Sequence, residues 1–318
     1  MNQYKFVIPP RFARKIEQFR VHCQVALQKP TARLAPTEDH RDPLPKPIMI
    51  VGPTGVGKTL FLTIFKKLYR DNYPDDKKHP IVEANCAHFG GDHNMIRSEL
   101  FGHVKGAFTG ALYNKVGVVA AANNGLLILE EIGDLPPETQ AMLLSFIETG
   151  EYYRVGDEYT KEGRPNPKKA YVQIVSATNR ENVIRGDLKY RFFPFYVPPL
   201  HERRHDILYY LHAKYPELIG TLTPSEVLAL LSHNWPGNVR EIERVGWLLT
   251  REKLLRSSLL SSNYEDPYRL FKIRSQEMDL NLEFIANISM TPDVNSGHEI
   301  FSCSNLPCIE LPLIDSRG

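Results

Sequence analysis

Cysteine, net charge and long apolar runs are all scarce in this sequence of 318 residues. Its four cysteines are too few and too unevenly spaced for a disulfide framework, and they form no zinc-type pair of Cys pairs. The 39 basic and 37 acidic residues leave a net charge of +2, so no global field attracts nucleic acid or an anionic membrane. We find neither a signal peptide nor an apolar stretch of the ~18 residues that a membrane helix needs. We therefore expect a globular protein of the reducing cytoplasm.

The pattern along the chain predicts four segments. Residues 1–45 contain a possible helix and then a proline-rich linker. Over residues 46–199, short apolar runs alternate with helical stretches, which is typical of an α/β fold with a parallel sheet covered by helices. Helical periodicity without strand signals predicts a small helical lid over residues 200–256. Residues 257–318 are irregular, and we assign them no fold or role.

A glycine-rich segment predicts a phosphate-binding loop. It follows an apolar run and precedes a helix, and this context favours a P-loop over a simple glycine-rich turn. Its backbone N–H groups would surround the phosphates, Lys58 would reach the outer phosphates and Thr59 would bind magnesium. The predicted nucleotide-binding residues are Gly52, Pro53, Thr54, Gly55, Val56, Gly57, Lys58, Thr59 and Leu60.

An apolar run that ends in two acids supplies the expected partner of this loop. Glu130 and Glu131 follow four apolar residues, so both would lie at the exposed end of a buried strand. On its own, such a pair is usually a solvated edge. Together with a P-loop, it predicts that Glu130 holds the magnesium shell and that Glu131 orients and deprotonates the attacking water.

A further motif consists of Gly106, Ala107, Phe108, Thr109, Gly110 and Ala111. Together with the motifs above, it resembles the sigma-54 activators, which are AAA+ P-loop ATPases, and the resemblance runs in order from Pro47 to Arg251. In that family the loop that contains this motif touches the sigma factor, and its threonine transmits the stroke.

The resemblance implies roles for five more residues. Asn85 matches the asparagine that senses nucleotide and restrains the catalytic glutamate. Asn179 falls where sensor I is expected, near the γ-phosphate. Arg185 and Arg191 match two arginine fingers, which act on the nucleotide of a neighbouring subunit. Arg240 would act as sensor II in the lid.

The segment of residues 106–111 also has a physical reading of its own. Phe108 lies between small residues, so the segment offers too little packing surface for a core helix. The residues suit a mobile loop tip, but exposing an aromatic ring is costly without a partner, so on their own they favour a tight turn whose phenylalanine packs back onto its own domain. The resemblance reverses this preference and implies an aromatic tip that is exposed for a partner.

The chain departs from the family in three places. Glu130 stands where an aspartate is usual, which places the magnesium-side carboxylate one methylene further out. Residues 117–120 lack the usual arginine and glutamate, so a subunit contact is expected to differ. The stretch at residues 158–169 is longer and more polar than usual.

These motifs predict an ATPase that uses ATP and magnesium to remodel the sigma-54 RNA polymerase holoenzyme. The resemblance implies a homo-oligomeric ring, typically a hexamer. Two alternatives stay open: a degenerate AAA+ scaffold that binds nucleotide with weak turnover, and an AAA+ remodeller of other substrates. A different substrate loop would be expected of the second alternative.

We expect no direct sequence-specific DNA binding from this chain. Residues 256–318 contain nine acidic and five basic residues, and no helix-turn-helix pattern is found there. An acidic segment of this kind repels the phosphate backbone.

Overall fold

The computed structural model divides into two compact units. The sheet unit lies within residues 16–197, and the helical unit comprises residues 198–254 with the first described residues of the chain. In the part of the chain that the structure describes, no helix is long and apolar enough to cross a membrane. Five stretches are described: residues 10–27, 45–90, 92–219, 222 and 224–254.

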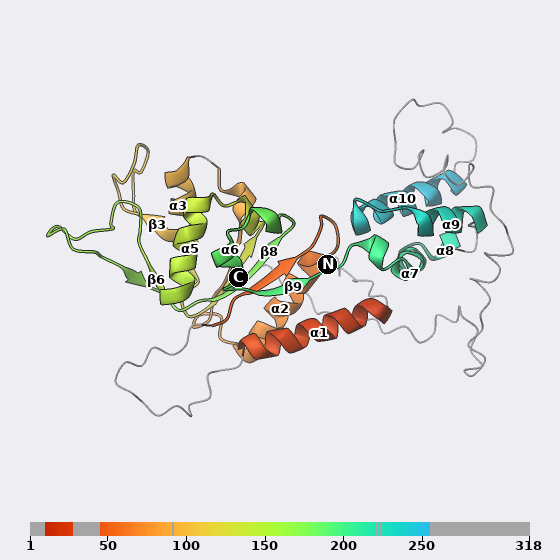
Figure 1. Cartoon of the computed structure of the whole chain (residues 1–318), viewed down its shortest axis with the longest axis horizontal. Coiled ribbons are helices and arrows are strands. Elements are labelled where there is room, and N and C mark those ends of the chain that lie inside the picture. The colour runs from red at the N-terminus through yellow and green to blue at the C-terminus, as the bar shows by residue number, and fades with distance from the viewer. Residues whose placement is uncertain (1–9, 28–44, 91, 220–221, 223, 255–318) are drawn as a thin grey trace. The chain divides into compact units, whose positions relative to one another are not determined.

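A five-stranded sheet forms the centre of the sheet unit (Figure 1). Its order is β2-β5-β8-β1-β9, and all neighbouring strands are parallel, which confirms the predicted α/β fold. Parallel strands buried on both faces are nearly continuous apolar runs, and this is the composition of β1 and β5. The strands are β1 (Ile48–Val51), β2 (Ile81–Asn85), β5 (Leu126–Glu130), β8 (Gln173–Thr178) and β9 (Phe193–Tyr196).

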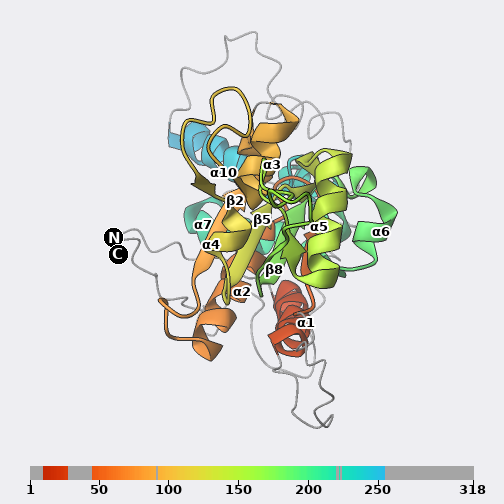
Figure 2. The same cartoon turned by 90° about the vertical axis from the view of Figure 1, so that its left-hand side faces the viewer.

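Helices cover both faces of this sheet (Figure 2). On one face, Met49 and Leu127 share a core with Phe146 of α5 (Pro137–Thr149). On the other face, the Phe61 ring of α2 lies 5.1 Å from the Phe195 ring of β9, centroid to centroid. The remaining helices around the sheet are α1 (Pro10–Leu27), α2 (Lys58–Asn72), α3 (His93–Phe101), α4 (Val118–Ala121) and α6 (Gly186–Lys189), with 3-10 turns η1 (Cys86–His88), η2 (Ile132–Asp134) and η3 (Glu181–Val183).

Two hairpins extend from one end of the sheet unit (Figure 1). The first, called here the GAFTGA hairpin, covers residues 102–116, and its short antiparallel strands are β3 (Gly102–His103) and β4 (Lys115–Val116). The second, called the polar hairpin, covers residues 151–169, with strands β6 (Glu151–Tyr152) and β7 (Lys168–Lys169).

The helical unit has a core of its own. Leu211, Ile242 and Leu249 are buried around Trp235, which is 1% exposed. Two non-glycine residues with positive φ mark the start of the last helix: Trp235 lies in the turn before it, and Asn238 is its first residue. The elements are η4 (Leu200–Glu202), α7 (His205–Lys214), α8 (Pro216–Ile219), α9 (Pro224–Ser232) and α10 (Asn238–Leu254).

Candidate nucleotide site and partner loop

The predicted P-loop connects β1 to α2 at the carboxyl end of the sheet. The Gly52 N–H donates to the Thr178 carbonyl over 3.2 Å, and a Cβ on Gly52 would lie 2.7 Å from the Val197 carbonyl oxygen. Gly57, the residue before α2, has φ 102, which favours glycine. Lys58 Nζ donates to the carbonyls of Gly52 and Pro53, at 2.9 and 3.2 Å. The lysine therefore lies inside the curve of its own loop.

The end of β8 brings a second motif to this loop. Asn179 Nδ2 donates to Thr54 Oγ1 over 2.8 Å, although 125 residues separate them. The preceding Thr178 accepts the Arg180 N–H on its side-chain oxygen at 3.0 Å. The sequence reasoning did not include Thr178, whose signal was a polar residue ending a buried strand. The structure thus brings the proposed sensor asparagine and the P-loop together.

The two acids after β5 lie at the same edge of the sheet. Glu130 pairs in register with Asn85 of β2, and Glu131 adopts a left-handed backbone with φ 50. Burial, then the charges of Glu83 and Glu131, raise the pKa of the Glu130 carboxyl, while the charges of His88 and Lys58 act in the opposite direction. A non-glycine residue with positive φ costs free energy and is common at functional sites.

Asn85 has a local role in this structure. Its side-chain oxygen accepts the Ala87 N–H over 3.0 Å and caps η1. This contact fixes the amide beside the β5 end, one strand away from Glu130. Another contact of β2 is the ion pair between Glu83 and Lys66 of α2. The sequence did not indicate this pair, because the two residues are 17 positions apart.

The donor set at this edge fits a magnesium ion. Thr59, in the first turn of α2, and Glu130 both offer oxygen ligands, and Mg²⁺ usually takes one or two ligands from the protein and the rest from water and phosphate. The described residues contain no group of three or more His, Cys, Asp or Glu side chains able to hold a metal.

The two candidate arginine fingers lie on the surface of the sheet unit. Arg185 forms two hydrogen bonds to Asp187, at 3.1 and 2.7 Å, and its side chain is 41% exposed. Arg191 pairs with Glu148 of α5, and its side chain is 56% exposed. Both guanidinium groups are therefore held by exposed acids and are accessible to another molecule.

The predicted loop of residues 106–111 is a closed turn. Gly106 N–H donates to the Ala111 carbonyl over 2.8 Å, and Ala111 N–H donates to the Phe108 carbonyl over 3.0 Å. Gly106 and Gly110 have φ 84 and 98, values that favour glycine. Thr109 is exposed.

Phe108 does not occupy the exposed position that we expected. Its ring is half-buried and lies 5.0 Å from the His103 ring, edge to face. His103 is itself buried, and its Nδ1 is hydrogen-bonded to Ser98 Oγ at 2.6 Å. The aromatic ring thus gains a packing partner within its own hairpin. The exposed apolar side chains lie just beyond, at Leu112 and Tyr113, which are 74% and 71% exposed.

Backbone contacts join the two hairpins. The Val104 N–H donates to the Val155 carbonyl at 3.1 Å, and the Val155 N–H donates to the Gly102 carbonyl at 2.9 Å. Gly156 has φ 79, and a Cβ there would lie 2.6 Å from the Ala107 Cβ. The polar hairpin therefore packs directly against the GAFTGA turn.

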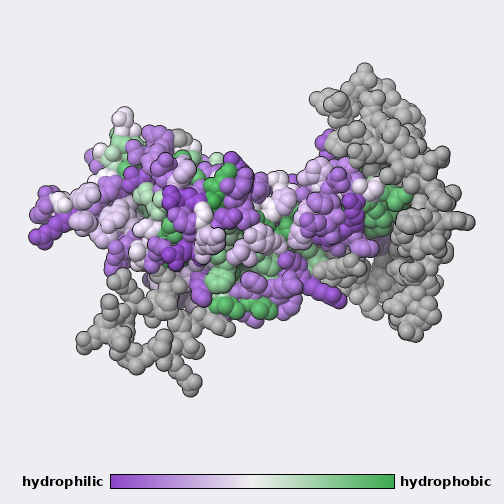
Figure 3. Space-filling view, in the orientation of Figure 1, coloured by the Kyte–Doolittle hydropathy of each residue, from purple (hydrophilic) through white to green (hydrophobic). Residues whose placement is uncertain are grey.

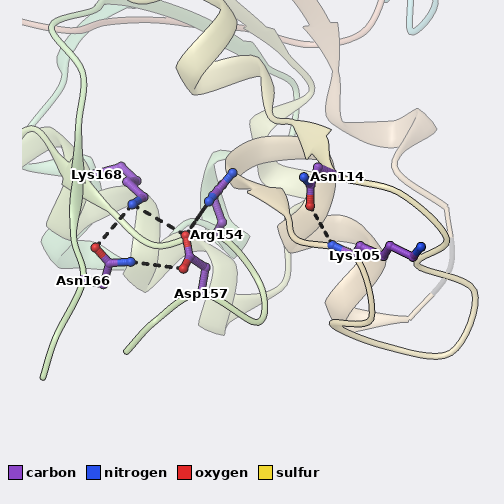
Figure 4. A network of polar contacts seen from close by, with 6 residues as sticks. All are labelled: Lys105, Asn114, Arg154, Asp157, Asn166 and Lys168. Carbon is purple, nitrogen blue, oxygen red and sulfur yellow. Dashed lines mark hydrogen bonds and ion pairs between the residues drawn. The ribbon is translucent and has the colours of Figure 1, made fainter. Parts of the chain in front are cut away.

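A polar network fixes the base of the polar hairpin (Figure 4). Asp157 accepts two hydrogen bonds from the Arg154 guanidinium and one from Asn166 Nδ2, the last at 3.1 Å, and it lies 3.6 Å from Lys168 Nζ. In the GAFTGA hairpin, Asn114 Oδ1 accepts the Lys105 N–H at 2.8 Å. The long polar segment that departs from the family pattern is thus an ordered hairpin.

The lid motif is built inside the helical unit. Asn238 Oδ1 accepts the Leu200 N–H at 2.7 Å, and Trp235 Nε1 donates to the Leu230 carbonyl at 2.8 Å. Glu241 accepts the Gly237 N–H at 2.8 Å and pairs with His233 at 2.7 Å. Arg240, the proposed sensor II, is exposed on the first turn of α10.

The chain matches a protein-family model and several curated relatives. The family model described as "Sigma-54 interaction domain" matches residues 26–195. The putative uric acid sigma-54-dependent transcriptional regulator UacR of Escherichia coli is 36% identical over 249 residues, covering 72% of this chain and 38% of that protein. The nitric oxide reductase transcription regulator NorR1 of Cupriavidus necator is 37% identical over 216 residues, covering 63% of this chain and 39% of that protein. The chain thus spans about two fifths of the length of these relatives.

Solved structures show the same fold. NtrX from Brucella abortus in complex with ADP matches with a TM-score of 0.51 and 24% identity, covering 86% of this chain and 59% of that one. The complex of NtrX with ATP matches with a TM-score of 0.50 and 26% identity, covering 86% and 58%.

Proposed function

This chain belongs to the family of sigma-54 interaction domains, and from that membership we propose that it hydrolyses ATP to remodel sigma-54 RNA polymerase at promoters. One observation carries the proposal: Lys58, Glu131 and Asn179 come from the segments that follow β1, β5 and β8, three adjacent parallel strands, and nucleotides bind at this carboxyl end of open α/β sheets. The relatives of similar sequence are named as sigma-54-dependent or nitric oxide reductase transcription regulators.

In the proposed reaction, the P-loop amides and Lys58 hold the outer phosphates of ATP. Thr59 and Glu130 hold a magnesium ion, which when bound neutralises charge on the phosphates. Glu131 orients the attacking water and accepts its proton. Asn179 and Asn85 sense the presence of the γ-phosphate from the ends of β8 and β2, the two strands that flank β5.

We propose that the active form is a homohexameric ring. Arg185 and Arg191 are both exposed and held by acids, so each is able to exchange its acid for a phosphate of a neighbouring subunit. Arg240 is the proposed sensor II. Hydrolysis then depends on assembly.

The GAFTGA hairpin is the proposed contact with sigma-54. Thr109 is exposed at its turn, and the neighbouring polar hairpin supports that turn through Gly156. Phe108 is packed on His103 in this structure, so its use as a contact requires the ring to leave that position.

We also propose that the chain has no sequence-specific contact with DNA and reaches promoters through the polymerase. A mobility-shift titration at moderate salt tests this part. A discrete complex that resists competitor DNA would contradict it.

The test of the main proposal has two readouts on the full chain. Phosphate release from ATP should be measurable, and purified sigma-54 should co-migrate with the chain in ADP plus fluoroaluminate but not in ADP. ATP binding without turnover would support the degenerate scaffold instead. Turnover without any sigma-54 complex would support a remodeller of another substrate.

A further inference from the structure

One face of α10 presents basic and aromatic side chains to solvent. Arg240, Arg244, Trp247 and Arg251 follow each other at spacings of four, three and four residues. At ~100° per residue, these spacings place all four within an arc of about 60°. All four are exposed, and Trp247 is 48% exposed. We call this surface the Arg–Trp face.

The opposite side of the helix fixes the direction of this face. Ile242, Val245 and Leu249 are buried in the core of the helical unit. Gly246 lies against the Tyr215 ring so closely that a Cβ would be 2.4 Å from it. The helix therefore cannot rotate to bury Trp247 without losing this contact.

The exposed Trp247 ring contacts the Arg251 side chain. The Arg251 guanidinium lies 4.4 Å from the centroid of the Trp247 ring, the geometry of a cation–π pair. A large exposed aromatic flanked by arginines is unusual on a surface without a partner, because tryptophan and arginine are enriched where other molecules bind.

Two arginines of the face, Arg240 and Arg251, form no ion pair with any residue that the structure describes. Two acids of the same helix have other polar partners: Glu243 accepts from Lys214 at 2.6 Å and from Tyr210 at 2.7 Å, and Glu241 pairs with His233. An acidic partner with apolar side chains would match this face.

We infer that the Arg–Trp face of α10 binds an acidic segment of the same chain, residues 277–283. Residues 277–299 contain five acidic residues and no lysine or arginine. In the first part of this stretch Glu277, Asp279 and Glu283 alternate with Met278, Leu280, Leu282 and Phe284, so an extended segment would present acids on one side and apolar groups on the other. The segment lies outside the described residues.

The length of the connection permits this contact. The face is about 16 Å long from Arg240 to Arg251 at 1.5 Å per residue. The 22 residues between Leu254 and Glu277 reach up to ~75 Å when extended, far more than a return along α10 requires. Covalent linkage also gives the segment an effective concentration of about millimolar, which favours it over a free anionic partner.

The test uses the tryptophan of the face as a reporter. The chain has two tryptophans, and one of them, Trp235, is only 1% exposed. The fluorescence of a Trp247→Phe variant gives the contribution of Trp235. After this contribution is subtracted, acrylamide quenching of the full chain reports on Trp247. We expect Trp247 to be shielded from acrylamide in the native sequence. High salt should remove the shielding, because it screens the ion pairs.

Charge reversal identifies the occupant. Replacing Glu277, Asp279 and Glu283 by Lys should expose Trp247, and adding Arg244→Glu with Arg251→Glu should restore the shielding. The matched control replaces Asp293, Glu299 and Asp315 by Lys, which changes the net charge equally and should leave Trp247 shielded.

Three outcomes would overturn the inference. Equal quenching in the native sequence and the Glu277, Asp279 and Glu283 variant would mean that this segment does not cover the face. Shielding that depends on protein concentration and survives the charge reversal would mean that a second copy covers it. Loss of shielding in the control variant alone would place the contact in another part of the tail.

Discussion

The carboxyl edge of the sheet and the GAFTGA hairpin belong to one unit but are held in different ways. At the sheet edge, Lys58, Glu130 and Asn179 follow buried strands whose register fixes them to their neighbours. In the hairpin, the position of Thr109 depends on two residue pairs of β-ladder, on the positive-φ glycines Gly106 and Gly110 beside it, and on backbone contacts with the polar hairpin.

This difference corresponds to two functions: hydrolysis at the carboxyl edge of the sheet and partner binding by the hairpin. Groups that polarise water and phosphate need fixed positions, because small displacements lower the rate strongly. A loop that meets a partner needs few buried contacts, because such segments move at low cost in free energy. The comparison predicts that changes at the edge remove hydrolysis and that changes in the hairpins leave it intact.

The largest expected effect is at the sheet edge. Glu131→Gln should retain ATP binding and reduce turnover by about 10²–10⁴-fold, the range typical for loss of a general base. Lys58→Ala should lose both binding and turnover. Nucleotide binding and phosphate release are measured on the same samples, and equal turnover in Glu131→Gln and the native chain would remove the proposed mechanism.

The second prediction is that turnover depends on contact between subunits. Turnover per subunit should rise with protein concentration, since arginine fingers act in trans and contribute about 10³–10⁵-fold. A small fraction of Arg191→Ala subunits should inhibit native subunits in mixed rings. Turnover that stays constant on dilution to monomer would instead indicate a self-contained site.

The third prediction concerns the support of the hairpin. Gly156→Val should displace the GAFTGA turn, because a Cβ at Gly156 would lie 2.6 Å from that of Ala107, and sigma-54 binding should fall while hydrolysis stays nearly unchanged. Gly163→Val is the matched control: its φ of 74 carries the same backbone cost of about 1–2 kcal/mol, but its Cβ would contact nothing within 4 Å. Equal binding by the two variants would refute the role of Gly156.

The smallest effect is expected from the network at the base of the polar hairpin. Hydrogen bonds from Arg154, then the charges of Arg154 and Lys168, lower the pKa of the Asp157 carboxyl below 3.8. The contacts therefore stabilise the folded hairpin above that pH, and the contribution is lost as the pH falls through the lowered value. Asp157→Asn should cost about 0–1 kcal/mol at neutral pH.

Amide hydrogen exchange across residues 153–168 measures this effect. The native chain and Asp157→Asn should differ at pH 7 and converge as the pH falls through the lowered pKa of Asp157, because both side chains are then neutral. A difference that persists unchanged in acid would show that the charge of Asp157 is not the cause.

The same comparison explains what could be predicted from the sequence. The runs in β1 and β5 and the P-loop context were enough to predict the parallel sheet, because buried parallel strands have a composition that is visible locally. β9 was missed, since Pro194 and the prolines that follow it argue against a strand. β9 is an outermost strand of the sheet, and proline is tolerated in such edge strands.

Contacts between distant segments were not predictable. The bond from Asn179 to Thr54 spans 125 residues, and no local pattern indicates it. The hairpins illustrate the same limit: the packing of Phe108 on His103, and of Gly156 on Ala107, depends on which segments the fold brings together. The residues alone favoured a tight turn with Phe108 packed back onto its own domain, and the family resemblance reversed this preference toward an exposed ring.

The central claim is that hydrolysis and partner contact are separable within one sheet unit, and Thr109→Ala tests it most directly. Thr109 is exposed in the GAFTGA turn, and the polar contacts that carry the nucleotide site come from other elements. Phosphate release and sigma-54 co-migration in ADP plus fluoroaluminate should be measured together on the native chain and the variant. We predict nearly native phosphate release with no sigma-54 complex; loss of phosphate release in Thr109→Ala would contradict the claim and make the loop part of the catalytic structure.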